Sequence, residues 1–164
     1  MRLQLEGHPD LQTASPSQVA RAVAALASPV GPTFIIANGH DGSYCQAAGT
    51  DGRYVLEARE VFGEGFLHYR ASLTGAGSGE TTKVYYRKRC DKHPPRRCPL
   101  TVLSSEVVGL DDVQQAIVTF AATGERCRET AWRDVTREFA SKQPTGEIRV
   151  IQPGAVSGPH RSQG

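Results

Sequence analysis

The chain has 164 residues, of which 38% are hydrophobic and 22% charged, and its formal net charge is +2. This length and composition are typical of one soluble globular domain that buries a core without needing disulfides or metal. No apolar run approaches the roughly 20 residues that cross a bilayer, and the N-terminus lacks the apolar stretch of a secretory signal, so we expect no membrane partner and a cytoplasmic location.

The first elements expected along the chain are an edge strand and a helix. Residues 1–6 alternate weakly and predict a short strand. Ser15 is suited to be a helix N-cap, and Pro16 follows it at the first helical position. Apolar residues then recur on one face of the expected helix. We expect a helix from about 16 to 27, ended by Pro29 and the Gly31-Pro32 pair.

The middle of the chain predicts an antiparallel sheet. Short runs rich in Val, Ile, Tyr, Phe and Thr are separated by glycine-containing turn signals and lie too close together for crossover helices. Neighbouring runs should therefore pair as a meander. The six runs are 33–38, 43–48, 54–60, 66–73, 82–89 and 100–104.

Two of these runs indicate how the sheet is covered. In 54–60 and 66–73, apolar and polar side chains alternate, so one face is apolar and the other polar. Helices should cover the apolar face, and the polar face should stay open to solvent. The predicted fold class is α+β: an antiparallel meander sheet of about five to six strands with helices packed on one face.

The last third predicts a second helix and a tail. Apolar residues at helical spacing follow Gly109, and Gly124 is suited to end the helix. Residues 125–140 fit either helix or strand, with Trp132 expected to plug the core beside Val135 and Phe139. From Ser141 the chain is polar and rich in Gly and Pro, so we expect one domain over 1–140 and a mobile tail over 141–164.

A basic segment, RKRCDKHPPRRC at 87–98, is the most distinctive motif. Its charges over 87–97 sum to +5, which leaves −3 for the rest of the chain. A positive charge this local argues against a general nucleic-acid coat and favours contact with one acidic partner. The six basic residues are Arg87, Lys88, Arg89, Lys92, Arg96 and Arg97, against Asp91.

The same segment leaves three states open for its cysteines. Cys90, His93 and Cys98 supply three ligand types for zinc, but Pro94-Pro95 favours an extended chain over a tight knuckle. A Cys90–Cys98 disulfide across a hairpin is a second state, and free thiols are a third and the default in a reducing cytoplasm. We expect no metal or cofactor, and thiols at the remaining cysteines.

Acid–base candidates have simpler explanations than catalysis. His40-Asp41 lies in a turn motif, and Glu57 and His68 on the polar strand face predict a solvated cross-strand pair. The glycine-rich stretch at 75–79 precedes a strand and not a helix, so we expect a hairpin connection and no phosphate loop. A deep pocket holding both Glu57 and His68 would indicate an enzyme; without it we expect a non-enzymatic protein.

The order of these motifs over residues 33–139 resembles small bacterial immunity proteins of polymorphic toxin systems. The matching residues are Ile35, Ile36, Asp41, Gly42, Tyr44, Gln46, Glu57, His68, Phe120 and Trp132. The segment 74–99 departs from that pattern because it looks longer. The resemblance implies a bacterial domain that occludes a protein partner, such as a cognate toxin, through a preformed surface.

The expected function is therefore protein binding through a basic hairpin loop and an open sheet face. The arginines and lysines of 87–97 would pair with acidic groups of the partner. Gln46, Glu57, His68 and Arg70 would contribute from the open face. The alternative is a nucleic-acid-binding or regulatory accessory domain that uses the same basic loop on phosphate.

Overall fold

The computed structural model of the chain describes residues 1–73, 79–90 and 93–140, without the side chains of 88–90, 93–95 and 140. The predicted tail at 141–164, most of the predicted glycine-rich connection and Lys92 lie outside the described residues. None of the helices in the described ranges is long and apolar enough to cross a membrane.

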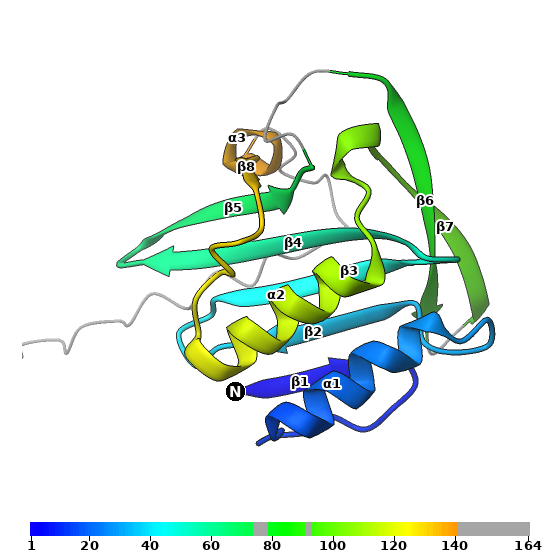
Figure 1. The fold of residues 1–164 in the computed structure, drawn as a ribbon, viewed down its shortest axis with the longest axis horizontal. Coiled ribbons are helices and arrows are strands. Elements are labelled where there is room, and N and C mark those ends of the chain that lie inside the picture. The colour runs from blue at the N-terminus through cyan, green and yellow to red at the C-terminus, as the bar shows by residue number, and fades with distance from the viewer. Residues whose placement is uncertain (74–78, 91–92, 141–164) are drawn as a thin grey trace, which may run out of the picture.

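A six-stranded antiparallel sheet forms the body of the molecule, in the order β1-β2-β3-β4-β5-β8 (Figure 1). The first five strands follow the chain as a meander, and the short β8 pairs with the outer side of β5. The α+β class with an antiparallel sheet is therefore confirmed. The strands are β1 (Arg2–Leu5), β2 (Phe34–Asn38), β3 (Tyr44–Thr50), β4 (Arg53–Phe62), β5 (Gly65–Ala71) and β8 (Trp132–Asp134).

Two helices cover one face of this sheet, as the alternation of apolar residues predicts (Figure 1). Helix α1 (Pro16–Ala24) continues into a 3₁₀ turn, η1 (Ala25–Ala27), and begins at Ser15, whose hydroxyl accepts a hydrogen bond from the Gln18 N–H. Helix α2 (Leu110–Thr123) ends at Gly124 in the left-handed region, with φ of 76°. The core between sheet and helices includes Ile35, Leu56, Val113, Ile117 and Phe120.

The last two predicted meander strands do not join the main sheet, which corrects the prediction. Among the described residues, β6 (Thr81–Cys90) and β7 (His93–Leu103) pair only with each other, in a separate two-stranded sheet. Val84 and Val102 of this hairpin bury against Val55, which faces away from the helices. The apolar residues of the hairpin are buried against the sheet face that the helices leave uncovered. The edge of β5, where the hairpin was expected to pair, is taken by β8.

Residues 125–140 contain both elements that the sequence left open. Trp132 opens strand β8, and Thr136–Ala140 form the short helix α3. Trp132 packs against the main core and donates its indole N–H to the Cys127 carbonyl oxygen at 2.8 Å. Phe139 instead stacks on His68, so the expected grouping of these two aromatic residues is wrong.

Candidate functional site

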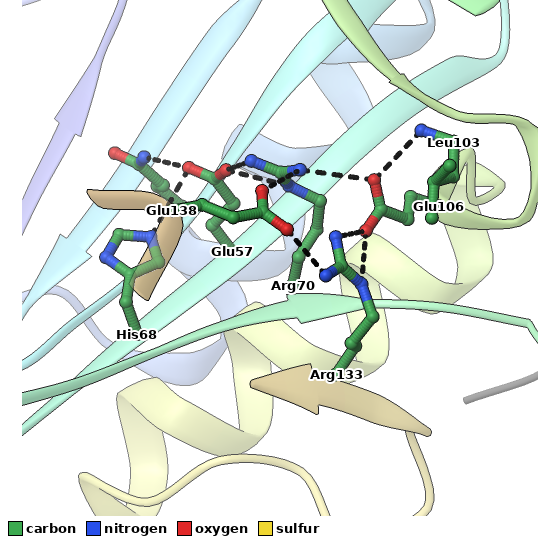
Figure 2. A network of polar contacts seen from close by, with 8 residues as sticks. Glu57, His68, Arg70, Leu103, Glu106, Arg133 and Glu138 are labelled. Atoms are coloured by element: carbon green, nitrogen blue, oxygen red, sulfur yellow. Dashed lines mark hydrogen bonds and ion pairs between the residues drawn. The ribbon is translucent and has the colours of Figure 1, made fainter. Parts of the chain in front are cut away.

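Six ionisable side chains meet on the sheet face opposite the helices and form what we call the charge network (Figure 2). They come from five elements that are distant in sequence: β4, β5, β8, α3 and the 3₁₀ turn η2 (Ser104–Glu106) that follows β7. The members are Glu57, His68, Arg70, Glu106, Arg133 and Glu138.

Arg70 lies at the centre of the charge network, between two carboxylates. Its Nε and Nη2 donate to Oε1 of Glu57 at 3.0 and 2.8 Å, and its Nη1 donates to Oε2 of Glu106 at 3.1 Å. Strand register explains the first contact because Glu57 and Arg70 are direct cross-strand partners. Arg70 therefore joins the sheet to η2.

Arg133 links the same carboxylate to α3. Its Nε donates to Oε1 of Glu106 at 2.8 Å, its Nη2 also contacts that oxygen, and its Nη1 donates to Oε1 of Glu138 at 2.6 Å. The other oxygen of Glu106 accepts the backbone N–H of Leu103 at 3.0 Å. Glu106, with a fully buried side chain, is thus held by two guanidinium groups and one backbone N–H.

His68 closes the charge network beside α3. Its ring stacks on Phe139 at 3.8 Å between centroids and meets the edge of Tyr44 at 5.8 Å. Its Nε2 lies 3.6 Å from Oε2 of Glu57, an oxygen that already accepts a hydrogen bond from the Gln46 amide at 2.9 Å. His68 and Glu57 are therefore neighbours inside the protein, beneath aromatic side chains.

The electrostatics of the charge network favour the ionised forms of Glu57, Glu106, Arg70 and Arg133. Burial by itself raises the pKa of Glu57, but the neighbouring His68 and Arg70 outweigh it and lower that pKa to about 2. Burial is likewise outweighed at Glu106, whose pKa is lowered by Arg133, the Leu103 N–H and Arg70. The carboxylates in turn raise the pKa of both arginines.

The expected solvated face at Gln46, Glu57, His68 and Arg70 is therefore wrong. The structure brings these four residues together and shields three of them, with the side chains of His68, Arg70 and Glu57 only 3%, 11% and 13% exposed, whereas Gln46 is half-buried. The polar pattern of the strands predicted an open face, but a polar face can be covered by other polar groups of the protein as well as by water. Their side chains position η2, β8 and α3 against the sheet.

The β6–β7 hairpin, which we call the basic ribbon, carries the second group of predicted site residues. Arg87 is partly exposed, at 32% of its side chain, but its contacts lie within the protein: its backbone N–H donates to the Thr33 hydroxyl at 2.7 Å, and its Nε lies 3.5 Å from Oε1 of Glu6. Its guanidinium also donates to the Gly31 carbonyl oxygen. Arg87 therefore fastens the basic ribbon to the body of the molecule.

Arg96 and Arg97 are exposed on the basic ribbon, in agreement with the sequence prediction. The guanidinium of Arg97 lies 4.4 Å from the centroid of the Tyr85 ring and 3.9 Å from a carboxylate oxygen of Asp51, and the Arg97 side chain is 64% exposed. Lys83 is also exposed. The predicted contacts of Lys88 and Arg89 involve side chains outside the described residues.

The free edge of β7 is protected by a proline. The Arg87 N–H donates to Thr33 and therefore points away from β7. Because backbone direction alternates along a strand, the N–H of Tyr85, two residues earlier, also points away from β7. Arg97 and Pro99, the cross-strand partners of these two residues, therefore direct their backbone groups away from β6, towards the free edge of β7. Pro99 thus stands where an N–H would face an incoming strand, which disfavours strand addition.

Strand register also separates the cysteines of the basic segment. Cys90 pairs with His93, whereas Cys98 pairs with Tyr86, four residues back along β6. Four residues of strand span about 13 Å, beyond the reach of a disulfide or of one zinc ion. Cys98 is a free thiol, and in the described chain no group of three or more His, Cys, Asp or Glu side chains is arranged to hold a metal.

The remaining candidates keep their structural explanations. Asp41 accepts the N–H and hydroxyl of Ser43 at 2.9 Å each, as expected for a turn. Cys45 and Cys127 are buried free thiols, and burial raises the pKa of Cys45. These residues contribute to the fold.

Three members of the charge network were not singled out by the sequence: Glu106, Arg133 and Glu138. Each follows a predicted strand or lies in the segment of ambiguous structure. The only signal in the sequence was the charged residues on the polar face of 54–60 and 66–73. Buried charges need partners of opposite charge, but the sequence does not show which residues these are. Comparisons of the chain with family models, curated proteins and solved structures gave no match.

Proposed function

We propose that the chain is a non-enzymatic protein-binding domain, similar to a bacterial immunity protein or inhibitor, that contacts an acidic partner through the basic ribbon. The observation that carries the proposal is the detachment of β6 and β7 from the main sheet with exposed cations on them. A separate two-stranded sheet presents its outer side chains without disturbing the core.

Charge supports an acidic partner. The described strands β6 and β7 hold six Lys and Arg residues and no Asp or Glu, and removing these six charges from the total of +2 leaves −4 elsewhere. Attraction between the basic ribbon and an acidic surface would speed association and orient the partner. The effect should weaken as added salt screens it.

The contact set differs from the sequence prediction in two ways. Arg87 becomes an anchor, and Gln46, Glu57 and His68 become supports of the fold, because their side chains already serve neighbours within the protein. Arg70 holds Glu57 and Glu106, and it stays in the proposal through its further contact with the exposed Glu138. Lys83, Tyr85, Arg96 and Arg97 become the proposed contacts. Lys88, Arg89 and Lys92 stay in the proposal as cations of the same segment.

Recognition would use side chains and not backbone pairing. Pro99 disfavours addition of a strand to β7, whereas Tyr85 and Arg97 form a stacked aromatic–cation pair on the ribbon. Arginine held against a ring loses less freedom when it binds a carboxylate, and both residue types are frequent in binding hot spots.

Charge reversal tests the proposal. The unmodified protein is used to capture its partner from the organism that carries the gene, and affinity is then measured with both purified proteins at low and moderate salt. Arg96→Glu/Arg97→Glu should weaken binding at least tenfold at low salt. The control Arg21→Glu/Arg128→Glu reverses two exposed arginines elsewhere and should change affinity less than threefold.

Two results would count against the proposal. Equal affinity of the wild type and the ribbon variant at low salt would remove the basic ribbon as the contact. Binding of DNA or RNA at micromolar protein near 0.1 M salt, lost in the ribbon variant, would favour the nucleic-acid alternative.

A further inference from the structure

The carboxylate of Glu138 occupies a position between two arginines of the charge network. Oε1 of Glu138 accepts from Nη1 of Arg133 at 2.6 Å, and Oε2 lies 3.7 Å from Nη1 of Arg70. Figure 2 shows the Glu138 side chain reaching over the pair from α3, with its carboxylate directed at both guanidinium groups. The two arginines thus form a cradle for one carboxylate.

The two less exposed carboxylates hold the arginines without Glu138. Glu57 and Glu106 contact Arg70 and Arg133 through four hydrogen bonds at 2.8 to 3.1 Å together with a close Arg133–Glu106 contact. Glu138 adds a third carboxylate to these two. Its departure would leave those contacts in place.

Exposure separates Glu138 from the other two carboxylates. Its side chain is 41% exposed, against 13% for Glu57 and 0% for Glu106. An exposed ion pair contributes little to stability, whereas removing a buried partner leaves an uncompensated charge. Of the three carboxylates, Glu138 can therefore exchange with an external one at the smallest cost.

Helix α3 has attachments to the sheet besides those of Glu138. The Thr136 hydroxyl accepts the His68 N–H at 2.9 Å, the Val135 N–H donates to the His68 carbonyl at 2.8 Å, and Phe139 stacks on the His68 ring. Val135 is itself buried. These contacts would hold α3 when the Glu138 side chain turns outward.

We propose that Arg70 and Arg133 form a carboxylate-binding site in which Glu138 is a resident, exchangeable occupant. A carboxylate of the partner, from an acidic side chain or a chain terminus, takes its place. This use of the site rests on the proposed function for its acidic partner. The site is joined to the basic ribbon through the chain, because η2 follows β7 directly and the Leu103 N–H binds Glu106.

Acetate tests the site without any partner. The full chain carrying Glu138→Ala is titrated with acetate at constant ionic strength, and the side-chain N–H signals of the arginines are followed by NMR. We expect acetate to bind at least tenfold more tightly than to the wild type, with shifts at Arg70 and Arg133. The matched control Glu125→Ala removes an exposed glutamate that pairs with Arg128, and it should bind acetate as weakly as the wild type.

Two results would overturn the inference. One is equal acetate affinity in the wild type, Glu138→Ala and Glu125→Ala. The other is loss of the Phe139–His68 contact in Glu138→Ala, seen in the ring signals, which would make Glu138 a clamp for α3 and not an exchangeable occupant. The proposed function stands or falls separately, because the ribbon variant Arg96→Glu/Arg97→Glu leaves the carboxylate site intact.

In a supporting arm, a short glutamate-rich peptide with an amidated C-terminus is compared with an alanine peptide that has a free C-terminus. Tighter binding of the first to Glu138→Ala assigns the site to acidic side chains, and tighter binding of the second assigns it to a chain terminus. Failure of both to bind Glu138→Ala more tightly than the wild type would refute a peptide carboxylate as the ligand.

Discussion

The charge network and the basic ribbon both use arginine, but they use it for different purposes. In the charge network, Arg70 and Arg133 are 11% and 16% exposed and donate to carboxylates at 3.1 Å or less. On the ribbon, Arg97 is 64% exposed and its neighbouring carboxylate, on Asp51, lies 3.9 Å away. The same side chain fixes the fold where buried carboxylates surround it and is available for binding where its carboxylate neighbour is exposed.

The comparison predicts that a charge-network arginine matters most for stability. Arg70→Met keeps the length of the side chain but leaves Glu57 and Glu106 buried without one of their cations. We expect the free energy of unfolding to fall by about 3–5 kcal/mol, measured by urea denaturation. Arg128→Met, at an exposed site, should change it by less than about 0.5 kcal/mol. A loss below about 1 kcal/mol for Arg70→Met would mean that the charge network does not stabilise the fold.

Acid should weaken the charge network next. Because the folded-state pKa of Glu57 is about 2, below its ordinary value of 4.5, its contribution is complete above pH 4.5 and is lost as the pH falls towards 2. We expect a loss of about 3 kcal/mol from this group over that range. In Glu57→Gln the unfolding free energy should depend less steeply on pH between 4.5 and 2. Identical slopes in the two proteins would contradict the lowered pKa.

The aromatic cover of the charge network should have an intermediate effect. Phe139→Ala removes the ring stacked on His68, and because Phe139 is only half-buried we expect a loss of about 2 kcal/mol. Thermal unfolding followed by circular dichroism measures it. The control Phe62→Ala removes an exposed ring and should shift the midpoint little. Equal shifts in both variants would show that Phe139 does not hold α3.

The smallest stability effect should come from the basic ribbon. Arg96→Glu/Arg97→Glu changes exposed side chains, so the unfolding free energy should stay within about 0.5 kcal/mol of the wild type. Urea denaturation checks this before any binding measurement. A loss above about 2 kcal/mol would place these arginines among the structural ones and erase the contrast between the two regions.

Local features of the sequence predicted local structure well. Ser15 and Pro16 start α1 as expected, Gly124 ends α2, and the alternation in 54–60 and 66–73 identifies the face that the helices cover. These signals succeed because caps, turns and periodicity depend on residues only a few positions apart.

The partners across the sheet could not be predicted in the same way. The polar alternation at Glu57, His68 and Arg70 is the same whether the face is solvated or covered by other polar side chains. The residues that cover it are far away in sequence: Glu106 lies 36 residues after Arg70, and Arg133 lies 27 residues after Glu106. The short strand β8 lies at the edge of β5, where the sequence predicted residues 82–89. The sequence did not predict β8 because three residues are too few to show a strand periodicity.

By itself, the sequence determined the α+β class, the two long helices, the apolar face and the concentration of positive charge at 87–97. Only the tertiary structure decided which of those charges are available. It bound Arg87 to Glu6 and Gly31 and left Arg96 and Arg97 exposed, although all three are arginines in one basic segment. The physical reason is that an arginine's role depends on whether folding brings a carboxylate or carbonyl oxygen within hydrogen-bonding reach, and those oxygens come from elsewhere in the chain.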